Sequence, residues 1–553
     1  MTDSPSGTLD ITAPDDFPVS FANPADAQET WEHDDMHMPF ALTPLAADFA
    51  VEVIGGGFNP YYESFGAPQR MHAAVWNGWA YFSFRANAPE GEEDAAEARW
   101  KEIRRARIPI TSAYWRDDVL PELKRLYEVI QARAFDGLPD DAAATAWLDA
   151  WAAARRAWVL HFTSIMGPYQ VLEDLSDAYA AAMGPGRDAE ALGLIGGSHH
   201  ELEDVEEGIE ALAGLADEAN LADVLERIVS SGEMTDELDL GQLRSDPGAD
   251  RFADELGRFL ARHGHLGQSH DDLRLASWAE APRTLLGQIV SRLGQPVSRT
   301  RVRETELARR ADELARGARA ALAGKPDELE HFETTLRYAR EIGYLTEGHN
   351  YWIDRMSQAR LRALAMRAGR RLVRQGALAG PDDVFFLGRD EVAEALRAPV
   401  DVRSLVERRK ADLERWEQIT PPSIVGKVPD SPAAGDRFDG ARVASTESDV
   451  LRGTGASAGI VRGRARLVLS QDDFGSIQAG DVIICPSSNP SWVPAFTIAA
   501  GLVTNTGGVL SHAAVVAREF GLPAVVGAAE ATARIADGQL VEIDGTAGTV
   551  RLL

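Results

Sequence analysis

From about residue 92 to residue 415, apolar side chains recur three and four positions apart almost without interruption. Phe252, Leu256 and Phe259 follow this spacing, which places them on one face of a helix. Glycine and proline break the pattern at a few points, namely 137–139, 184–186, 246–248 and 380–381. A periodic region this long, with so few breaks, predicts many antiparallel helices in one large domain.

The residues before this region have other patterns. Residues 1–20, rich in Ser, Thr, Pro and Asp, predict a flexible N-terminus, and residues 31–45 are too irregular for a helix or strand, so we expect an ordered loop. Residues 72–84 predict two strands around a turn at Asn77 and Gly78. Residues 55–57 are three glycines without the spacing of a phosphate-binding loop, and we expect a turn there.

After the helical region the composition changes twice. Residues 420–456 are rich in Pro, Gly, Asp and Ser and predict a linker, whereas residues 457–553 contain short β-rich runs separated by glycines and predict a compact α/β domain. The predicted fold is therefore multidomain: a flexible 1–20, a mainly α-helical domain over 21–419, the linker over 420–456, and a C-terminal α/β domain over 457–553.

One histidine, His512, stands where a glycine-rich turn leads into a helix. Gly507 and Gly508 permit a tight turn, Ser511 is a good helix cap, and residues 513–519 are good helix formers that end at a glycine. The N–H groups and positive dipole of such a helix start suit a phosphate and disfavour a protonated imidazole. A neutral His512 is then a nucleophile that can attack phosphorus.

The residues around His512 resemble a known family. Thr506-Gly507-Gly508, the run from Ser511 to Glu519, and the run from Gly521 to Gly527 are similar to the swivelling phosphohistidine domain of the PEP-utilising enzymes. Members include rifampin phosphotransferase and phenylphosphate synthase. The resemblance implies that His512 carries a phosphoryl group. The phosphate-binding residues that it implies are Thr506, Gly507, Gly508 and Ser511.

A weaker resemblance extends through the helical region and rests on residues 37–45, 77–81, 259–265, 340–341 and 376–387. These segments resemble the acceptor-binding domain of rifampin phosphotransferase, which implies that residues 21–419 bind the acceptor and that the C-terminal domain swivels. The resemblance also implies that Arg340 faces the incoming phosphohistidine, where a guanidinium can hold two phosphoryl oxygens. The other interpretation is an ordinary helical ion pair with Glu341 or Asp354. Four residues further on, this chain has Tyr344 where the family has a lysine.

Acceptor activation needs a base, and histidines supply the candidates. His263 and His265 are the first candidates, with His37, His349 and Glu347 behind them. The pairs His263/His265 and His199/His200 could also suggest a metal, but neither has a third ligand at metal-binding spacing, so no metal is expected.

Composition excludes several classes of partner. A formal charge of −30 disfavours nucleic acid and acidic membrane surfaces. The lack of a signal peptide or a long apolar run predicts a cytoplasmic protein. The single cysteine, Cys485, excludes an internal disulfide and is expected in a strand.

No glycine-rich nucleotide loop is present, so ATP and Mg²⁺ are expected on a separate ATP-grasp subunit. By resemblance to phenylphosphate synthase, we expect a two-component phosphotransferase that phosphorylates a small aromatic hydroxyl, of the phenol or cresol type, and releases AMP and phosphate. Two alternatives are an antibiotic-type hydroxyl acceptor, as in rifampin phosphotransferase, and a phosphocarrier or regulatory protein.

Overall fold

The computed structural model describes residues 17–21, 23–34, 37–89, 91–197, 201–230, 248–267, 272–295, 299–427, 449–469, 473, 476–488, 496, 498–509 and 511–553, with the backbone alone at 299, 512 and 519. The mainly helical region and the C-terminal α/β region that the sequence predicts are both confirmed. Among the described helices, none is both long and apolar enough to cross a membrane.

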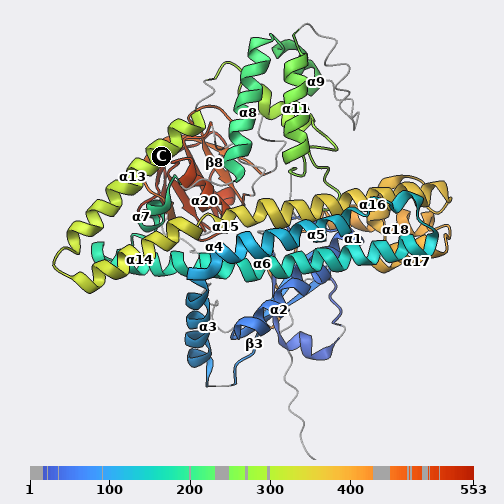
Figure 1. Ribbon diagram of the computed structural model, residues 1–553, viewed down its shortest axis with the longest axis horizontal. Helices are drawn as coiled ribbons and strands as arrows, with labels where there is room; N and C mark the ends of the chain where they lie inside the picture. Colours follow the sequence, from blue (N-terminus) through green and yellow to red (C-terminus); the bar gives the residue numbers. More distant parts are fainter. Residues whose placement is uncertain are drawn as a thin grey trace, which may run out of the picture.

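The main helical core is built around one long helix, α6 (Asp140–Met183), which spans 44 residues, or roughly 66 Å at the α-helical rise. Figure 1 shows α6 running across the whole width of the molecule, with α14 and α16 along it. Both ends fall where the sequence predicts breaks. The other helices of this core are α1 (Pro44–Asp48), α2 (Gly56–Phe65), α3 (Glu93–Arg107), α4 (Thr111–Tyr114), α5 (Leu120–Gln131), α7 (Asp188–Leu192), α13 (Arg299–Ala321), α14 (Pro326–Ile342), α15 (Leu345–His349), α16 (Met356–Arg374), α17 (Arg389–Arg397) and α18 (Arg403–Trp416).

Three turns of this core are wound as π-helix, a geometry often found at functional sites. They are η2 (Phe49–Gly55), η4 (Trp115–Val119) and η7 (Asn350–Arg355). Short 3₁₀ turns fill the remaining connections. These turns are η1 (Pro24–Gln28), η3 (Ile108–Ile110), η5 (Phe135–Gly137), η6 (Gly193–Ile195) and η8 (Pro381–Phe386).

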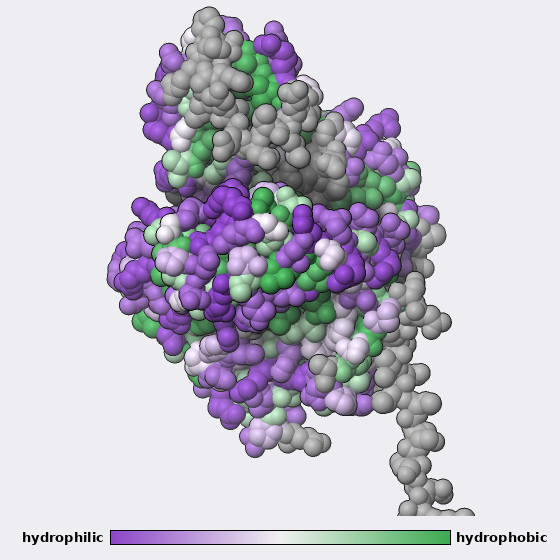
Figure 2. Space-filling view, turned by 90° about the vertical axis from the view of Figure 1, so that its right-hand side faces the viewer, coloured by the Kyte–Doolittle hydropathy of each residue, from purple (hydrophilic) through white to green (hydrophobic). Residues whose placement is uncertain are grey.

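A small helical lobe projects from the core. It contains α8 (Glu201–Glu218), α9 (Ala222–Ser230), α11 (Asp250–His263) and α12 (Arg283–Val290), and it buries an apolar cluster of its own. Inside it, Arg292 donates to the buried Glu206 at 2.7 Å. Figure 2 shows the lobe as a separate projection above a mainly hydrophilic face of the core. Tyr351 of η7 belongs to the lobe's cluster and so ties the lobe to the core.

A four-stranded antiparallel sheet covers the N-terminal part. Its strand order is β2 (Gln69–Trp76), β3 (Trp79–Ala86), β1 (Thr30–His33), β4 (Ile424–Gly426). The predicted hairpin is confirmed, with Asn77 at φ 51° and Gly78 at φ 80°. The expected loop over 31–45 is wrong at both ends, because Trp31 pairs with Val425 in the sheet and α1 begins at Pro44.

Two further expectations for this part fail. Residues 17–20 of the predicted flexible N-terminus are held in place, because Phe17 is fully buried and Asn77 donates to the Pro18 carbonyl. Residues 55–57 are helical instead of a turn. A Cβ at Gly57 would lie 2.8 Å from the Trp158 Cβ, so that glycine lets α2 approach α6 closely.

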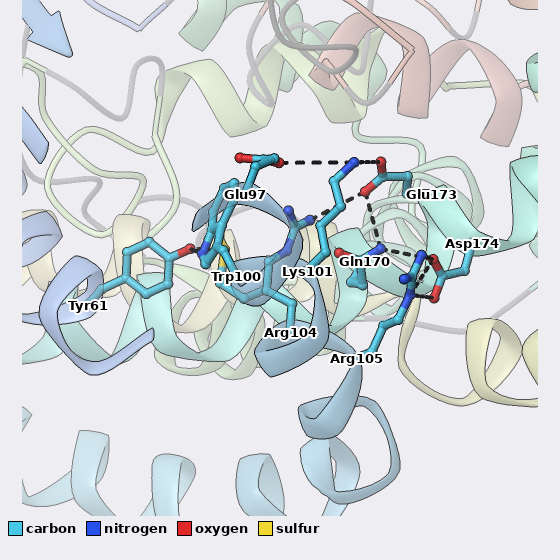
Figure 3. A network of polar contacts seen from close by, with 10 residues as sticks. Tyr61, Glu97, Trp100, Lys101, Arg104, Arg105, Gln170, Glu173 and Asp174 are labelled. Carbon is cyan, nitrogen blue, oxygen red and sulfur yellow. Dashed lines mark hydrogen bonds and ion pairs between the residues drawn. The ribbon is translucent and has the colours of Figure 1, made fainter. Parts of the chain in front are cut away.

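A polar network fixes α3 to α6 (Figure 3). Arg105 donates to both carboxylate oxygens of Asp174, and Lys101 donates to Glu173 at 3.0 Å. Gln170 donates to Asp174 at 2.9 Å, which gives this carboxylate a second partner. The network anchors a helix that otherwise buries few apolar residues.

The C-terminal domain is an eight-stranded mixed sheet. Its order is β5 (Val450–Arg452), β12 (Thr549–Leu552), β11 (Leu540–Asp544), β7 (Ile460–Leu467), β8 (Val482–Cys485), β9 (Gly501–Thr504), β10 (Ala524–Val526), β6 (Thr454–Ser457). Strands β7 to β10 are parallel neighbours, and α20 (His512–Glu519) connects β9 to β10 while the short α21 (Ala531–Arg534) follows β10. Cys485 lies buried in β8, as predicted, and burial raises its pKa.

The predicted linker, residues 420–456, includes residues that belong to strands. Its described ends are strands: β4 pairs with β1, β5 pairs with β12, and β6 pairs with β10. Polar composition misled the prediction because short edge strands need few apolar residues. Residues 428–448 lie outside the described part of the chain.

Candidate functional site

The start of α20 has the geometry that the sequence predicts. Ser511 is the N-cap, and its hydroxyl accepts from the Ala514 N–H at 3.4 Å and donates to the Gly508 carbonyl at 2.8 Å. Position 512 is the first residue of the helix. The side chain of His512 lies outside the described part, so its contacts and orientation stay a prediction.

The loop before α20 is held by its own backbone and by β8. Thr506 donates through its hydroxyl to the Pro486 carbonyl, and Thr504 donates to the Thr506 carbonyl at 2.6 Å. Gly507 has φ 107°, and a Cβ there would lie 2.7 Å from the Ser511 hydroxyl oxygen. The structure thus brings Thr506, Gly507, Gly508 and Ser511 together in one turn at the helix start. Phosphate binding by that turn stays a prediction.

The C-terminal domain is docked on the helical core (Figure 1). Val509, just before α20, is buried in the apolar cluster of the core, and the Arg303 guanidinium lies 4.0 Å from the centre of the Phe520 ring. On α20, Val515 and Arg518 face a pocket shared by the two regions. Position 512 lies one turn before Val515 on the same helix.

The shared pocket has a volume of about 90 Å³. Its helical wall includes Arg310 of α13 and Tyr344, Thr346 and Glu347 at the start of α15, and Ser457 lies on the opposite wall. Burial raises the pKa of Tyr344, so its hydroxyl stays protonated and can donate a hydrogen bond. The pocket therefore combines carboxylate, guanidinium and phenol groups beside the helix that begins at position 512.

Arg340 lies on α14, one turn before Tyr344. Its guanidinium donates to the Leu194 carbonyl and to Asp312 of α13, each at 3.0 Å. The partner is thus Asp312, and neither Glu341 nor Asp354. Arg340 is not among the residues that line the pocket, whereas Arg310 and Tyr344 are.

His263 and His265 are at the base of the small lobe. His263 Nδ1 lies 2.9 Å from the Tyr351 hydroxyl, and the His265 ring meets the same tyrosine edge-on at 4.5 Å. Burial lowers the pKa of His263 to about 4 and that of His265 to about 3. Both rings therefore stay neutral at physiological pH, and neither lines the shared pocket.

The remaining candidates are dispersed. His37 contacts Asp34 near the N-terminal sheet, with Nδ1 2.9 Å from the carboxylate, and His199 and His200 lie outside the described residues. Glu347 does line the pocket, and His349 is buried two residues later. Sequence reasoning missed Arg310, Arg518 and the pair His161–Asp354, whose members are 193 residues apart and share no motif.

Two family models match this chain. Residues 477–548 match the PEP-utilising enzyme mobile domain, and residues 162–347 match the fourth domain of rifampicin phosphotransferase. The first match contains α20 and its capping turn. The second runs from the middle of α6 to Glu347, so it ends at the pocket that α20 faces.

Several curated proteins are similar to this chain. A rifampicin phosphotransferase of Streptomyces sviceus is 32% identical over 327 residues, which is 57% of this chain and 36% of that protein. Chondramide synthase of Chondromyces crocatus is 28% identical over 98% of this chain and 14% of that protein. An uncharacterised protein of Mycobacterium tuberculosis is 42% identical over 36% of this chain and 22% of that protein. The chain spans 36% or less of each of these three relatives.

The C-terminal region therefore resembles the mobile domain of PEP-utilising enzymes, and the helical region resembles part of rifampicin phosphotransferase.

Proposed function

We propose that this chain is the phosphohistidine and acceptor-binding part of an ATP-dependent phosphotransferase of the rifampicin phosphotransferase type. The observation that carries the proposal is the position of α20. It begins at residue 512 under the Ser511 cap, and its next turns face a pocket lined by the helical domain.

The proposed reaction has two steps. In the first, a ring nitrogen of His512 attacks the β-phosphorus of ATP and AMP leaves with the bridging oxygen; water then cleaves the β–γ bond, inorganic phosphate leaves, and a phosphohistidine remains. In the second, an acceptor hydroxyl oxygen attacks that phosphorus, the N–P bond breaks, and the hydroxyl proton passes to a base. Glu347, one of the carboxylates that line the pocket, would take the proton, while Arg310 and the Tyr344 hydroxyl would offset charge on the phosphoryl oxygens.

The acceptor is proposed to be a hydroxyl of a large antibiotic-type molecule. The rifampicin phosphotransferases among the relatives favour this acceptor over the phenol or cresol that the resemblance to phenylphosphate synthase suggested. A pocket of about 90 Å³ is small compared with the roughly 300–1,000 Å³ of sites for drug-sized ligands. The acceptor would therefore bind only when the mobile domain has moved away from the core.

ATP and Mg²⁺ are proposed to bind an ATP-grasp protein supplied separately, with AMP and phosphate as co-products. In the described residues, the loops and helix starts include no glycine-rich nucleotide loop. The mobile domain would then carry the phosphoryl group between two distant sites, since one histidine must reach both ATP and the acceptor.

The test is phosphoryl labelling. The chain is incubated with Mg²⁺, an ATP-grasp protein and ATP labelled in its β- and γ-phosphoryl groups, and we expect acid-labile, base-stable label on the wild type and on His331→Ala, but none on His512→Ala. His331 is an exposed residue of α14 and serves as the matched control. Equal label on His512→Ala would refute the assignment. Transfer from the labelled chain to rifamycins, phenols and other alcohols then identifies the acceptor class.

A further inference from the structure

A compact cluster of buried side chains lies inside the helical domain, apart from the mobile domain. His161 comes from the middle of α6, His349 ends α15, and Asp354 lies in the π-helical turn η7. Their exposed fractions are 7%, 3% and 4%. One nitrogen or oxygen atom of each lies within 4.8 Å of the corresponding atoms of the other two.

Hydrogen bonds orient both imidazole rings. His349 Nδ1 lies 2.6 Å from the Leu345 carbonyl oxygen, and because a carbonyl can only accept, Nδ1 carries the proton and Nε2 carries the lone pair. His161 Nδ1 lies 2.6 Å from a carboxylate oxygen of Asp354. The two rings meet edge to face at 4.4 Å, and Trp158 stacks on His161 at 4.8 Å, so neither ring can turn far.

These features are those of a metal site. Two imidazoles and one carboxylate are ligands that zinc takes in proteins. A metal-bound histidine usually donates its other N–H to a carboxylate, a backbone carbonyl or water, and His349 donates to the Leu345 carbonyl. Ligands of a tetrahedral zinc lie about 3.4 Å apart, so an ion would replace the 2.6 Å contact between His161 Nδ1 and Asp354 or bind His161 through Nε2, and would draw the more distant ligand atoms together. Asp354 lies in a π-turn and contacts His161 of α6, and such turns occur often at functional sites.

We propose that His161, His349 and Asp354 bind a divalent transition-metal ion, with Zn²⁺ as the best match. Three protein ligands leave a fourth position for water or a hydroxyl group. Glu347, two residues before His349, lines the shared pocket, whereas His161, His349 and Asp354 are not among the residues that line it. The proposal concerns metal binding by the resting chain and does not depend on phosphoryl transfer.

The experiment measures metal content and coordination. The full chain is stripped with a chelator, equilibrated with Zn²⁺ and analysed for zinc by mass spectrometry; Co²⁺ is added to a second sample and its visible d–d absorption recorded. We expect about one ion per chain in the wild type and in His331→Gln, and an affinity at least tenfold lower in His349→Gln and in Asp354→Asn. The Co²⁺ bands of the wild type should indicate nitrogen and oxygen ligands in a tetrahedral or five-coordinate site.

Two results would overturn the proposal. If the folded wild type binds no more Zn²⁺ than Asp354→Asn and shows no Co²⁺ bands, the cluster is only a hydrogen-bond network. If His331→Gln loses as much metal as His349→Gln, the ion binds surface histidines. The wild-type Co²⁺ spectrum decides the matter even if the variants fold poorly, because it needs no substitution.

Discussion

Burial determines whether His263 of the helical domain is protonated. His263 is 4% exposed and contacts the Tyr351 hydroxyl, and burial keeps its pKa near 4. Its neutral form is therefore favoured by the folded state, whereas the unfolded chain takes up a proton near pH 6.5. Stability from this residue is fully present above that pH and is lost as the pH falls toward 4.

We expect the small lobe to lose stability in acid because of His263. The difference between the folded and unfolded pKa values lowers the free energy of unfolding of the lobe by about 2 kcal/mol at pH 5 relative to pH 8. Hydrogen exchange of the α8 and α11 amides at pH 8 and at pH 5, corrected for the intrinsic exchange rate, measures the loss. His263→Gln should reduce the pH dependence and His331→Gln should leave it unchanged. The same pH dependence in His263→Gln would assign the acid sensitivity to other groups.

The second prediction at the residue level concerns Arg340. If it clamps the phosphoryl group, Arg340→Ala should leave phosphorylation of His512 nearly normal and slow transfer to the acceptor by about a hundredfold, as expected for loss of one such electrostatic contact. The assay phosphorylates the chain, removes ATP, adds acceptor and follows loss of label. Asp312→Ala is the matched control, because it removes the ion-pair partner but keeps the guanidinium.

An ion pair this exposed contributes little to stability, about 0–1 kcal/mol. If Arg340→Ala and Asp312→Ala transfer their label at the same rate as the wild type, Arg340 has a surface role only. The clamp would then be sought at Arg310 and Tyr344, which line the pocket.

At the level of elements, periodicity predicted the helices well, and turn chemistry predicted the hairpin at Asn77 and the helix start at Ser511. These features depend on neighbouring residues alone. The helical state of 55–57 could not be predicted, since glycine is a poor helix former and its advantage here comes from Trp158, about a hundred residues away. For the same reason no local pattern joined His161 to Asp354.

The contact between α2 and α6 gives the element-level prediction. Gly57→Ala places a Cβ 2.8 Å from the Trp158 Cβ, where α6 cannot yield, and should destabilise the core by about 1–3 kcal/mol, as overpacking does. Gly137→Ala is the control, because a Cβ there meets nothing within 4 Å. Urea unfolding followed by circular dichroism compares the two. Equal urea midpoints for the two variants would mean that α2 shifts away from α6 without loss of stability.

At the level of the whole molecule, the mobile domain is docked against α7, α13 and α15. If this is the acceptor-side position, the chain between β4 and β5 must let the domain leave it. Removing ten residues from within 428–448 shortens the reach by roughly 30 Å when extended. We expect this deletion to block phosphorylation from ATP and to spare transfer from a chemically phosphorylated His512 to the acceptor.

The two half-reactions are measured separately on the deletion variant. A variant in which the same ten residues are replaced by a Gly/Ser sequence of equal length controls for the composition of the segment. If the shortened chain is phosphorylated from ATP as fast as the control, the domain does not need to travel.

The pairing of β1 with β4 also determines when the N-terminal sheet can be completed during synthesis. Thr30 donates to the carbonyl of Lys427, 397 residues later in the chain. At a translation rate of about 5–20 residues per second, β1 waits roughly 20–80 s for its second neighbour. During that time the edge of β1 and the aromatic side chains Trp31 and Tyr81 lack the cover of Val425. An unpaired strand edge of this kind favours aggregation, so slow completion of the sheet exposes the nascent chain at this point.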